Sequence, residues 1–404
     1  MEMWKRNLFI CWIGAFATAS ALSQIAPILP LYVEHLGVSD LESIEMWSGL
    51  AFGITGMMMA LVSPLWGQAA DRFGRKAMLL RASLGMAIVL FFMSFVTSVY
   101  QLVGLRLLMG TISGFNSGAI TLIATQTPRD RAGWALGTLS TGMVGGSLLG
   151  PLIGGFLAEF LGVRSVFLST SVLLLIAFAL TLCFVKENFT LGDKKIFTTK
   201  QVWQMIPQRK LLLSMFLTTY LLSAALFSIE PIITVYIKQL MLETDHVALI
   251  SGLVFAASGL ASMISAPRLG KLSDKIGPEK VMTAALFIAS LLFIPQAFVK
   301  NEWQLLGLRF LLGLATAALL PSVNTLIKRT TPDQVTGRIF GYNQSAQFLG
   351  MFSGSVLGGQ TAAFLGIRSV FFVTSLLMLI NACWVYFTVL KVSAAQKIKE
   401  ESSH

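Results

Sequence analysis

Phe160-Leu-Gly-Val-Arg-Ser-Val-Phe167 returns as Phe364-Leu-Gly-Ile-Arg-Ser-Val-Phe371, with one substitution, 204 residues further along the chain. Shorter patterns repeat at an offset of 203 or 204 residues: they pair Gly67, Asp71 and Gly74 with Gly270, Asp274 and Gly277, Arg106 with Arg309, and Thr121 and Pro128 with Thr325 and Pro332. The chain is therefore a duplication of a unit of roughly 200 residues. Duplicated halves in a very apolar chain are typical of proteins that hold a central site between two helical bundles.

The composition indicates that lipid, rather than water, surrounds most of the chain. Hydrophobic residues make up 55% and charged residues 12% of the sequence, and its mean hydropathy is +0.75. A soluble domain carries about 25% charged residues. Apolar stretches such as 166–185 and 370–390 are close to the roughly 20 residues that a helix needs to cross about 30 Å of hydrocarbon. We therefore expect an all-α polytopic membrane protein.

Twelve apolar runs are long enough to span a bilayer, six in each half of the chain. They lie near residues 7–33, 46–66, 77–96, 99–122, 133–157, 163–185, 211–237, 247–267, 281–298, 303–326, 337–360 and 367–390. Helices are expected because lipid offers no hydrogen-bond partner to an open backbone, and the runs lack the alternation of a membrane β-barrel. The prediction is two pseudo-symmetric six-helix bundles, residues 1–185 and 211–404, joined by a cytoplasmic linker over 186–210.

The net charge of +11 reflects membrane topology rather than nucleic-acid binding. With a cytoplasmic N-terminus, most of the 30 Lys and Arg residues fall in cytoplasmic loops and tails, as the positive-inside rule requires, and both termini are cytoplasmic. The three cysteines lie in separate apolar runs, and the three histidines lie in outer loops or at the end of the chain. We therefore expect no disulfide, no metal site and no cofactor.

The loop after the second run carries the most specific motif, Gly67-Gln-Ala-Ala-Asp71-Arg72-Phe-Gly74-Arg75-Lys76. Its glycines permit a tight reversal, whereas its basic residues alone would be explained by the anchoring of a cytoplasmic loop. The whole motif resembles the signature loop of the major facilitator superfamily, G-x-L-x-D-R-x-G-R-K. The resemblance implies that Asp71 and Arg75 gate the cytoplasmic side against the other bundle. Asp274 marks a less complete second copy.

The fifth run contains glycines at four-residue spacing, which places them on one helical face and permits close helix packing. The residues are Gly142, Gly146, Gly150 and Gly154, with Pro151 and Gly155 beside them. For each glycine taken singly, a packing seam is the simpler interpretation. The whole run resembles the motif of antiporters within the superfamily, and the corresponding stretch 354–359 lacks the proline. This asymmetry favours export by exchange over uptake by symport.

Charged residues inside the runs are candidates for proton coupling, because a charge at mid-membrane costs at least about 2.5–3.5 kcal/mol on insertion scales. Glu230 is the one carboxyl group that the sequence places well inside a run; it can exchange a proton or attract a cationic substrate, unless its side chain reaches the outer surface. Glu34, at the outer end of the first run, is a further candidate for proton coupling, unless its side chain reaches water. Arg106 begins a segment that resembles the superfamily motif whose arginine is tied to proton coupling, and an interhelical anchor is the alternative. Arg81 is expected to extend towards the cytoplasmic surface.

The superfamily lines its central cavity with helices one, four, seven and ten and with parts of four others. The resemblance therefore selects polar and aromatic residues in those runs as candidates for substrate binding: Gln24, Tyr32, Asn116, Phe227, Glu230, Asn343 and Gln347. Polar side chains inside a membrane more often join helices to one another. The 29 Phe and 18 Met residues allow an adaptable apolar cavity.

Over its whole length the chain resembles the twelve-helix drug:proton antiporter subfamily. The stretches 29–37 and 125–142 are similar to bacterial multidrug exporters of the fosfomycin and fluoroquinolone resistance type. The resemblance implies a monomeric transporter, not an enzyme, in a bacterial inner membrane. It would exchange protons for lipophilic drugs as two bundles rock about a central site. The alternatives are an exporter of sugars or other metabolites and a non-transporting membrane sensor; an intramembrane enzyme lacks support because the chain has no HExxH or GxSxG motif.

Overall fold

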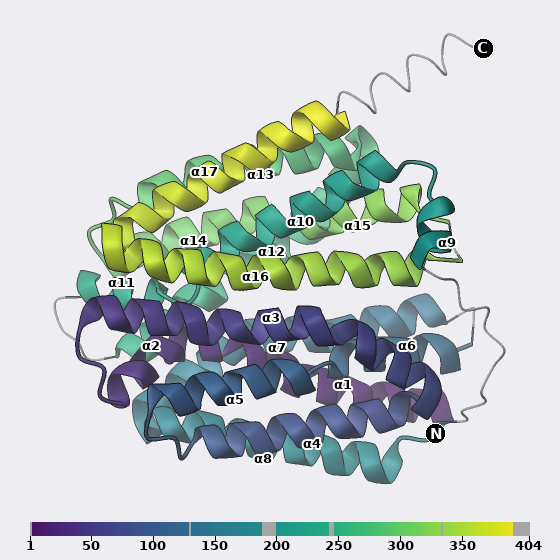
Figure 1. Cartoon of the computed structure of the whole chain (residues 1–404), viewed down its shortest axis with the longest axis horizontal. Coiled ribbons are helices and arrows are strands. Elements are labelled where there is room, and N and C mark those ends of the chain that lie inside the picture. The colour runs from purple at the N-terminus through teal and green to yellow at the C-terminus, as the bar shows by residue number, and fades with distance from the viewer. Residues whose placement is uncertain (1, 129–130, 188–198, 242–245, 333, 391–404) are drawn as a thin grey trace. The chain divides into compact units, whose positions relative to one another are not determined.

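The computed structural model describes residues 2–128, 131–187, 199–241, 246–332 and 334–390, and within these ranges every regular element is helical (Figure 1). The first half contains α1 (Met3–Ser23), α2 (Ile25–His35), α3 (Leu41–Phe73), α4 (Arg75–Met93), α5 (Val99–Ile112), α6 (Phe115–Gln126), α7 (Ala132–Leu161) and α8 (Val163–Phe184). The second half contains α9 (Thr199–Gln204), α10 (Arg209–Ile229), α11 (Ile233–Leu240), α12 (Val247–Ile276), α13 (Pro278–Gln296), α14 (Glu302–Thr316), α15 (Leu319–Thr330), α16 (Thr336–Leu365) and α17 (Ile367–Val385), which ends in a π-helical turn, η1 (Tyr386–Leu390).

The helices account for the expected number of membrane spans. Eleven helical segments of the described chain are long and apolar enough to cross a bilayer, and the pair α1 and α2, bent by 46°, brings the number to twelve. Three of the other spans combine two helices each: α5 with α6, α10 with α11, and α14 with α15. The prediction of an all-helical protein with twelve transmembrane spans is confirmed.

The breaks within spans recur at equivalent places, in the first and fourth span of each half. The break between α5 and α6 lies at Ser113 and Gly114, and the break between α14 and α15 lies 204 residues later, at Ala317 and Ala318. Between α10 and α11, Pro231 has no N–H to donate to the carbonyl of Phe227, and the hydroxyl of Ser355 donates to that carbonyl instead (3.2 Å). A side chain thus supplies the hydrogen bond that the backbone has lost, which lipid would not do.

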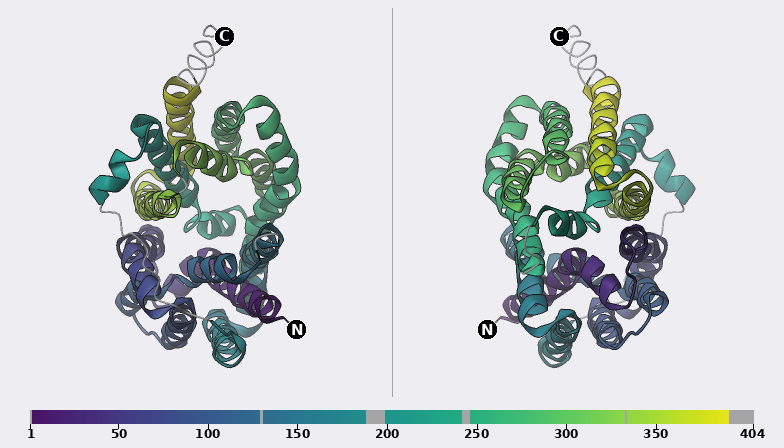
Figure 2. Two further views of the ribbon diagram at one scale, coloured as in Figure 1. Left: turned by 90° about the vertical axis from the view of Figure 1, so that its right-hand side faces the viewer. Right: turned by 90° about the vertical axis from the view of Figure 1, so that its left-hand side faces the viewer.

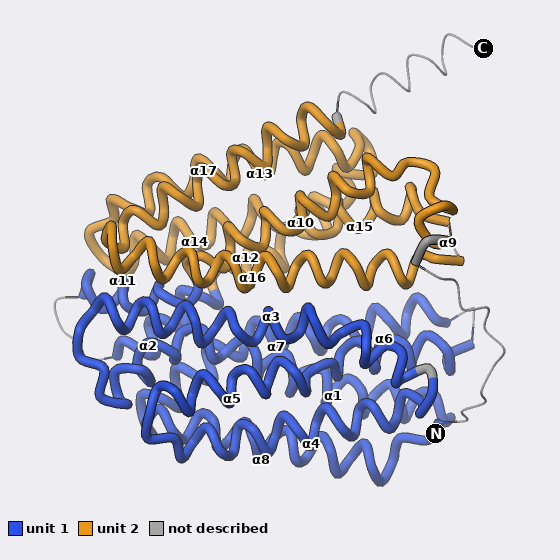
Figure 3. Tube along the Cα trace, viewed as in Figure 1, with its two compact units in different colours: residues 1–193, 230–256 blue, residues 194–229, 257–404 orange. Residues whose placement is uncertain are grey.

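The chain divides into two compact units (Figure 3). Unit 1 contains residues 1–193 and 230–256, and unit 2 contains residues 194–229 and 257–404. The segment 230–256 therefore groups with the first half, although the duplication assigns it to the second. Of the predicted linker 186–210, residues 188–198 lie outside the described chain, and α9 belongs to unit 2, where Trp203 stacks on Tyr342 with ring centroids 6.4 Å apart. The division into 1–185, 186–210 and 211–404 stays a prediction.

The same helix pairs pack within each unit (Figures 1 and 2). In unit 1, α1 lies along α7 and α4 lies along α8; in unit 2 their repeats α10 and α16, and α13 and α17, pack in the same way. The buried core of unit 1 includes Leu79, Phe115 and Leu139, which come from α4, α6 and α7. The three thiols are free: Cys11 is buried, whereas Cys183 and Cys383, on the last helix of each half, are exposed. The internal duplication is thus present in the packing as well as in the sequence.

Glycines close the seam between α1 and α7. A Cβ atom placed on Gly142 would lie 2.8 Å from the carbonyl oxygen of Trp12, and a Cβ atom on Gly146 would overlap the carbonyl oxygen of Phe16. Cβ atoms placed on Gly150 and Gly154 would likewise overlap side-chain atoms of Ser23 and Gln24, which belong to the same span as Trp12 and Phe16. The repeat is equally close, since Gly350, Gly354 and Gly358 of α16 lie against the carbonyl oxygens of Tyr220, Ala224 and Ser228 of α10. Backbones approach so closely only where no side chain separates them.

Gly146→Ala is expected to destabilise the protein, because the added methyl group has no room against the backbone of Phe16. Overpacking of this kind costs about 1–3 kcal/mol. Gly137→Ala is the matched control, since it lies in the same helix and nothing lies within 4 Å of its added Cβ atom. Thermal unfolding of the purified protein in detergent should show a lower midpoint for G146A and an unchanged or slightly higher midpoint for G137A. Equal midpoints for the two variants would contradict the packing account.

Candidate functional site

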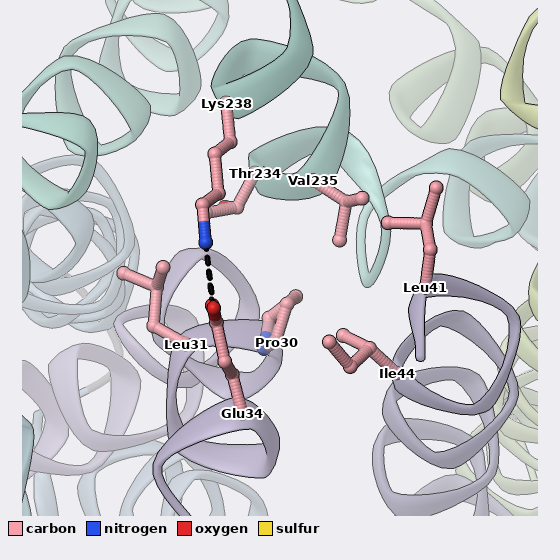
Figure 4. A pocket seen from close by; sticks show the side chains of 8 residues that line it. All are labelled: Pro30, Leu31, Glu34, Leu41, Ile44, Thr234, Val235 and Lys238. Atoms are coloured by element: carbon pink, nitrogen blue, oxygen red, sulfur yellow. Dashed lines mark hydrogen bonds and ion pairs between the residues drawn. The ribbon is translucent and has the colours of Figure 1, made fainter. Parts of the chain in front are cut away.

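In unit 1, α2 and α11 meet around a small cavity near one end of their spans (Figure 4). The Lys238 ammonium donates to both carboxylate oxygens of Glu34, at 2.7 and 2.8 Å, and the Thr234 hydroxyl donates to the Pro27 carbonyl at 2.8 Å. The cavity holds about 40 Å³. Its remaining walls are apolar: Pro30, Leu31, Leu41, Ile44 and Val235. The two helices are thus joined by an ion pair and a hydrogen bond at the edge of an apolar pocket.

The environment of Glu34 favours a structural role. Its side chain is 43% exposed and that of Lys238 is 38% exposed, so both groups reach solvent while they pair. An exposed ion pair contributes only about 0.2–1 kcal/mol. Both oxygens of the Glu34 carboxylate are engaged by the Lys238 ammonium. The interaction therefore fits the attachment of α11 to α2 better than proton transfer.

The glycine stripe of α7 has a second neighbour in unit 1, the beginning of α12. A Cβ atom on Gly155 would lie 2.5 Å from the Ala248 carbonyl oxygen, and Gly252 packs directly on the Pro151 carbonyl. At the adjoining loop, the Glu159 carboxylate accepts from the backbone N–H of His246 (3.1 Å) and lies 3.0 Å from the His246 Nδ1 atom. His246 is the only residue other than glycine with positive φ in the described chain (φ 67°). The repeat in α16 reproduces the glycine seam and Gly359, the counterpart of Gly155, but has Ser355 in place of Pro151.

Glu230 lies in the turn where α10 ends and α11 begins. The turn follows from Pro231, which interrupts the helical hydrogen bonds, and the Glu230 side chain is partly buried there. Its place between two helical segments of one span agrees with its selection from the sequence as a residue inside a span. Discontinuous helices of this kind often supply ion and substrate sites in transporters.

Arg106 is fixed against α3. Its side chain is 2% exposed, its Nε atom donates to the Ala51 carbonyl (3.0 Å), and its guanidinium lies 5.7 Å from the centre of the Phe52 ring. The Thr55 hydroxyl in turn donates to the Arg106 carbonyl (2.9 Å). These contacts support the anchoring alternative. The Nη1 atom is buried without a hydrogen bond among the described residues, so the anchor leaves one donor unused.

Glu45 is a buried carboxyl group that the sequence analysis missed. The second apolar run was expected to begin near residue 46, whereas α3 begins at Leu41 and Glu45 is 2% exposed. The signal for this earlier start is Asp40, whose carboxylate accepts from the backbone N–H of Ser43 (2.9 Å) as an N-cap. The hydrogen bonds from Ser43 lower the pKa of Asp40 below its usual value. Glu45 thus joins Glu230 as an acid within a span.

In the signature loop, the start of α4 binds a carboxylate from the end of the first half. Gly74 takes a positive φ (87°), which ends α3 and begins α4. The backbone N–H groups of Arg75 and Lys76 donate to the two Glu187 oxygens at 2.9 and 2.7 Å, and the Lys76 ammonium donates to the Leu182 carbonyl (3.0 Å). An acid at a helix N-terminus satisfies open donors and interacts with the helix dipole. Glu187 was assigned to the linker, so its role was missed.

The other residues of the loop add less to this arrangement. Gly67 lies where a Cβ atom would meet nothing within 4 Å, and the Arg72 guanidinium lies 5.4 Å from the Phe73 ring. The side chain of Asp71 lies outside the described part of the chain, so its gating role stays a prediction. In the second copy, Gly277 repeats the positive φ (99°), and α13 carries its own acid, Glu279, in its first turn.

Asp274 borders a separate cavity in unit 2, of about 620 Å³, near the start of α13. Charged groups of both signs line it, among them Lys275, Glu279, Lys280 and Arg329. Asp274 itself is exposed. The mixture of charges shows no clear preference for one kind of ligand.

The predicted substrate-binding residues fall into two groups. Three are engaged in helix packing: Gln24 donates to the Thr170 hydroxyl, the buried Tyr32 hydroxyl donates to the Met93 carbonyl, and Asn343 accepts from the Thr219 hydroxyl (2.8 Å). These bonds favour the alternative of interhelical contacts. The remaining four are only partly buried and stay candidates: Asn116, Phe227, Glu230 and Gln347. The described residues contain no cluster of His, Cys, Asp and Glu that could hold a metal ion.

Arg81 turns inward rather than towards the cytoplasmic surface. Its guanidinium lies 3.5 Å from the centre of the Trp66 ring and donates to the Ser113 carbonyl (3.2 Å), at the break between α5 and α6. The Trp66 indole N–H donates to the Thr111 carbonyl (2.7 Å), two residues earlier. Both side chains therefore satisfy carbonyls that the broken helix leaves open. The expectation that Arg81 extends to the surface is corrected by these contacts.

Glu187→Ala is expected to destabilise the start of α4, because two backbone N–H groups lose a charged acceptor. Hydrogen bonds to a charged group contribute about 1.5–3 kcal/mol, so the unfolding midpoint in detergent should fall. Lys186→Gln is the control: this neighbouring side chain is exposed, and its contacts with Asn7 involve only the Lys186 backbone. A midpoint for E187A equal to that of K186Q would rule out a stabilising role for this carboxylate.

The Glu34–Lys238 pair should show weak, salt-sensitive coupling. A double-mutant cycle with Glu34→Gln and Lys238→Gln is expected to give about 0.2–1 kcal/mol, because both side chains are exposed to solvent. High salt should reduce the value, since mobile ions screen exposed charges. The cycle is measured by thermal unfolding at low and high salt. A coupling well above 2 kcal/mol that salt does not change would be inconsistent with an exposed pair.

Comparison with known proteins adds independent information. The family model of the Major Facilitator Superfamily matches residues 11–294 and, in a second match, residues 232–403. "Multidrug resistance protein MdtG" of Serratia proteamaculans (strain 568) is 50% identical over 385 residues, which cover 95% of this chain and 94% of that protein. The protein of the same name from Dickeya zeae (strain Ech586) is 47% identical over 398 residues and 98% of each chain.

Solved structures agree in fold. A bacterial homolog of the human lysosomal transporter Spinster has a TM-score of 0.78 at 13% identity, over 97% of this chain and 98% of that chain. The human organic anion transporter MFSD10 (TETRAN) has a TM-score of 0.68 at 17% identity, over 95% and 100% of the two chains. With a duplicated fold of twelve spans and sequence matches along nearly its whole length, this chain belongs to the Major Facilitator Superfamily of membrane transporters.

Proposed function

We propose that this chain is a multidrug efflux transporter of a bacterial inner membrane, which exports lipophilic, cationic or zwitterionic drugs in exchange for protons. The observation that carries the proposal is the identity of 47–50% with proteins named for multidrug resistance, over nearly the full length of each. Relatives this similar and this completely aligned usually share a substrate class. Both termini would lie in the cytoplasm, as the distribution of basic residues suggests, and the protein would act as a monomer.

Two features support proton exchange as the energy source. Glu230 is a partly buried acid beside a proline break, which suits a group that alternates between a proton and a cationic substrate. Pro151 and Gly155 lie in the glycine-rich run that resembles the antiporter motif, and they bring α7 against the start of α12. An acid that binds either a proton or a cationic drug couples the two flows, because neither can occupy the site while the other is bound.

The proposed mechanism is alternating access by rocking of two six-helix bundles, residues 1–185 and 211–404. Asn116, Phe227 and Gln347, which are only partly buried, would contact the drug together with Glu230. The loop with Asp71, Arg72 and Arg75 would gate the cytoplasmic side. Glu187, bound at the N-terminus of α4, would hold the base of that loop in place.

Dye efflux from everted membrane vesicles tests the proposal. Wild-type vesicles should transport a fluorescent lipophilic cation such as ethidium only while a pH gradient exists. Glu230→Gln should reduce the rate about a hundredfold or more, the lower end of the range for loss of a proton-transfer group. Glu302→Gln is the control, because it removes a partly buried acid from the first turn of α14. Wild-type transport that continues unchanged after an uncoupler collapses the gradient would refute proton exchange. Inhibition by sugars rather than by lipophilic cations would refute the drug specificity.

A further inference from the structure

Unit 1 contains a line of buried polar groups along one face of α3. Glu45 is 2% exposed and Ser48 is fully buried. Glu45 and Phe52 are seven residues apart, which is two helical turns, so they project from nearly the same side of α3, with Ser48 between them. Arg106 reaches this side from α5 through its contacts with Ala51 and Phe52. A carboxyl group, a hydroxyl group and a guanidinium thus share one seam over about 10 Å of helix.

Several atoms in this seam have no protein partner. The Ser48 hydroxyl oxygen and the Arg106 Nη1 atom are buried without a hydrogen bond in the described residues. Within those residues, no hydrogen bond or ion pair involves the Glu45 side chain either. Buried polar atoms of this kind are usually satisfied by ordered water. An unpaired carboxylate is far more costly to bury than the neutral acid, so the seam favours a bound proton.

We propose that Glu45, Ser48 and Arg106 form a hydrated proton-binding site, in which Glu45 takes up and releases the proton. The proposal rests on the proposed proton exchange and adds a second carboxyl group to Glu230. On release, the O–H bond of the Glu45 acid breaks and the proton passes to a water molecule. The carboxylate that remains is stabilised by the Ser48 hydroxyl and by water held on the Arg106 Nη1 atom. Uptake reverses these steps, and no oxidant or reductant takes part.

Arg106 acts here as a positioning residue. A guanidinium keeps its proton throughout the physiological range, so Arg106 carries none itself. Its unused Nη1 donor instead holds a water molecule of the site in place. Ser48 can donate to the carboxylate and accept from water at the same time, which suits a relay between them.

Other titratable groups lie on the helices that pack against α3. They are Tyr32, Glu34 and His35 on α2, Arg75, Lys76 and Arg81 on α4, and Tyr100 and Arg106 on α5. Glu34 forms an ion pair with Lys238. Arg81 stacks on the Trp66 ring and donates a hydrogen bond to the Ser113 carbonyl. On α3 itself, Glu42 lies one turn before Glu45 and is exposed. Glu34 and Lys238 border a cavity with Leu41 and Ile44 of α3, next to Glu45, but they pair with each other, whereas Arg106 keeps an unused donor.

Infrared difference spectroscopy of the purified protein tests the protonation of Glu45 without any transport assay. At neutral pH, wild type should show the C=O stretching band of a protonated carboxylic acid, and Glu45→Gln should lose that band. Glu42→Gln, an exposed acid on the same helix, should keep it. Identical acid bands in wild type and E45Q would show that Glu45 is ionised and would overturn the proposal.

Proton release on ligand binding tests whether the site participates in exchange. Tetraphenylphosphonium is added to weakly buffered protein in detergent with a pH indicator, and wild type and E42Q should release the same number of protons. Release from E45Q should fall by at least half while the cation still binds. If E45Q releases as many protons as wild type, the proposed role of Glu45 is wrong, but proton exchange itself can still hold. If wild type binds the cation and releases no protons, the proposed proton exchange is refuted. Glu45→Asp, which keeps the acid, should restore release and guards against misfolding of E45Q.

Discussion

Lipid provides no hydrogen-bond partner, and this constraint shapes the whole molecule. Each span has to satisfy its backbone groups within the protein, which makes helices obligatory and makes every interruption costly. The interruptions nevertheless occur, in the first and fourth spans of both halves, and neighbouring side chains bond the carbonyls next to them. The Ser355 hydroxyl donates a hydrogen bond to the Phe227 carbonyl. The Trp66 indole and the Arg81 guanidinium donate to the carbonyls of Thr111 and Ser113, respectively. The breaks are therefore stabilised parts of the fold, and candidate residues such as Glu230 and Asn116 lie next to them.

Because the chain is duplicated, features present in both halves can be assigned to the general fold, and features present in one half can be recognised as particular to it. Close glycine seams occur in both halves, between α1 and α7 and between α10 and α16, so that packing belongs to the general architecture. Pro151 has no equivalent in the second half, where Ser355 stands at its position, and Pro151 and Gly155 pack against the start of α12. The two copies of the signature loop differ in a similar way. In both, a helix begins after a glycine with positive φ, but the acid at its N-terminus comes from Glu187 in one copy and from Glu279 in the other.

The sequence predicts the architecture well because apolar length and the internal repeat are long-range signals. Its predictions for single polar residues are less reliable, because burial and pairing depend on neighbours from distant spans. Gln24 and Tyr32 looked available for a substrate, yet each is held by a partner in another helix. Glu45 was missed since hydropathy alone began its span five residues late, although Asp40 marks the helix start. Glu187 was missed because nothing in a polar connector indicates that it returns to bind α4.

The placement of the three thiols has a practical consequence. Cys183 and Cys383 stand at the ends of the closing helices of the two halves and face outward, whereas Cys11 is enclosed. A small lipid-soluble thiol reagent that reaches the lipid-facing surface would thus label one native position per half, without engineered cysteines. Distances between the paired probes could then follow the relative motion of the halves during turnover in the unaltered protein.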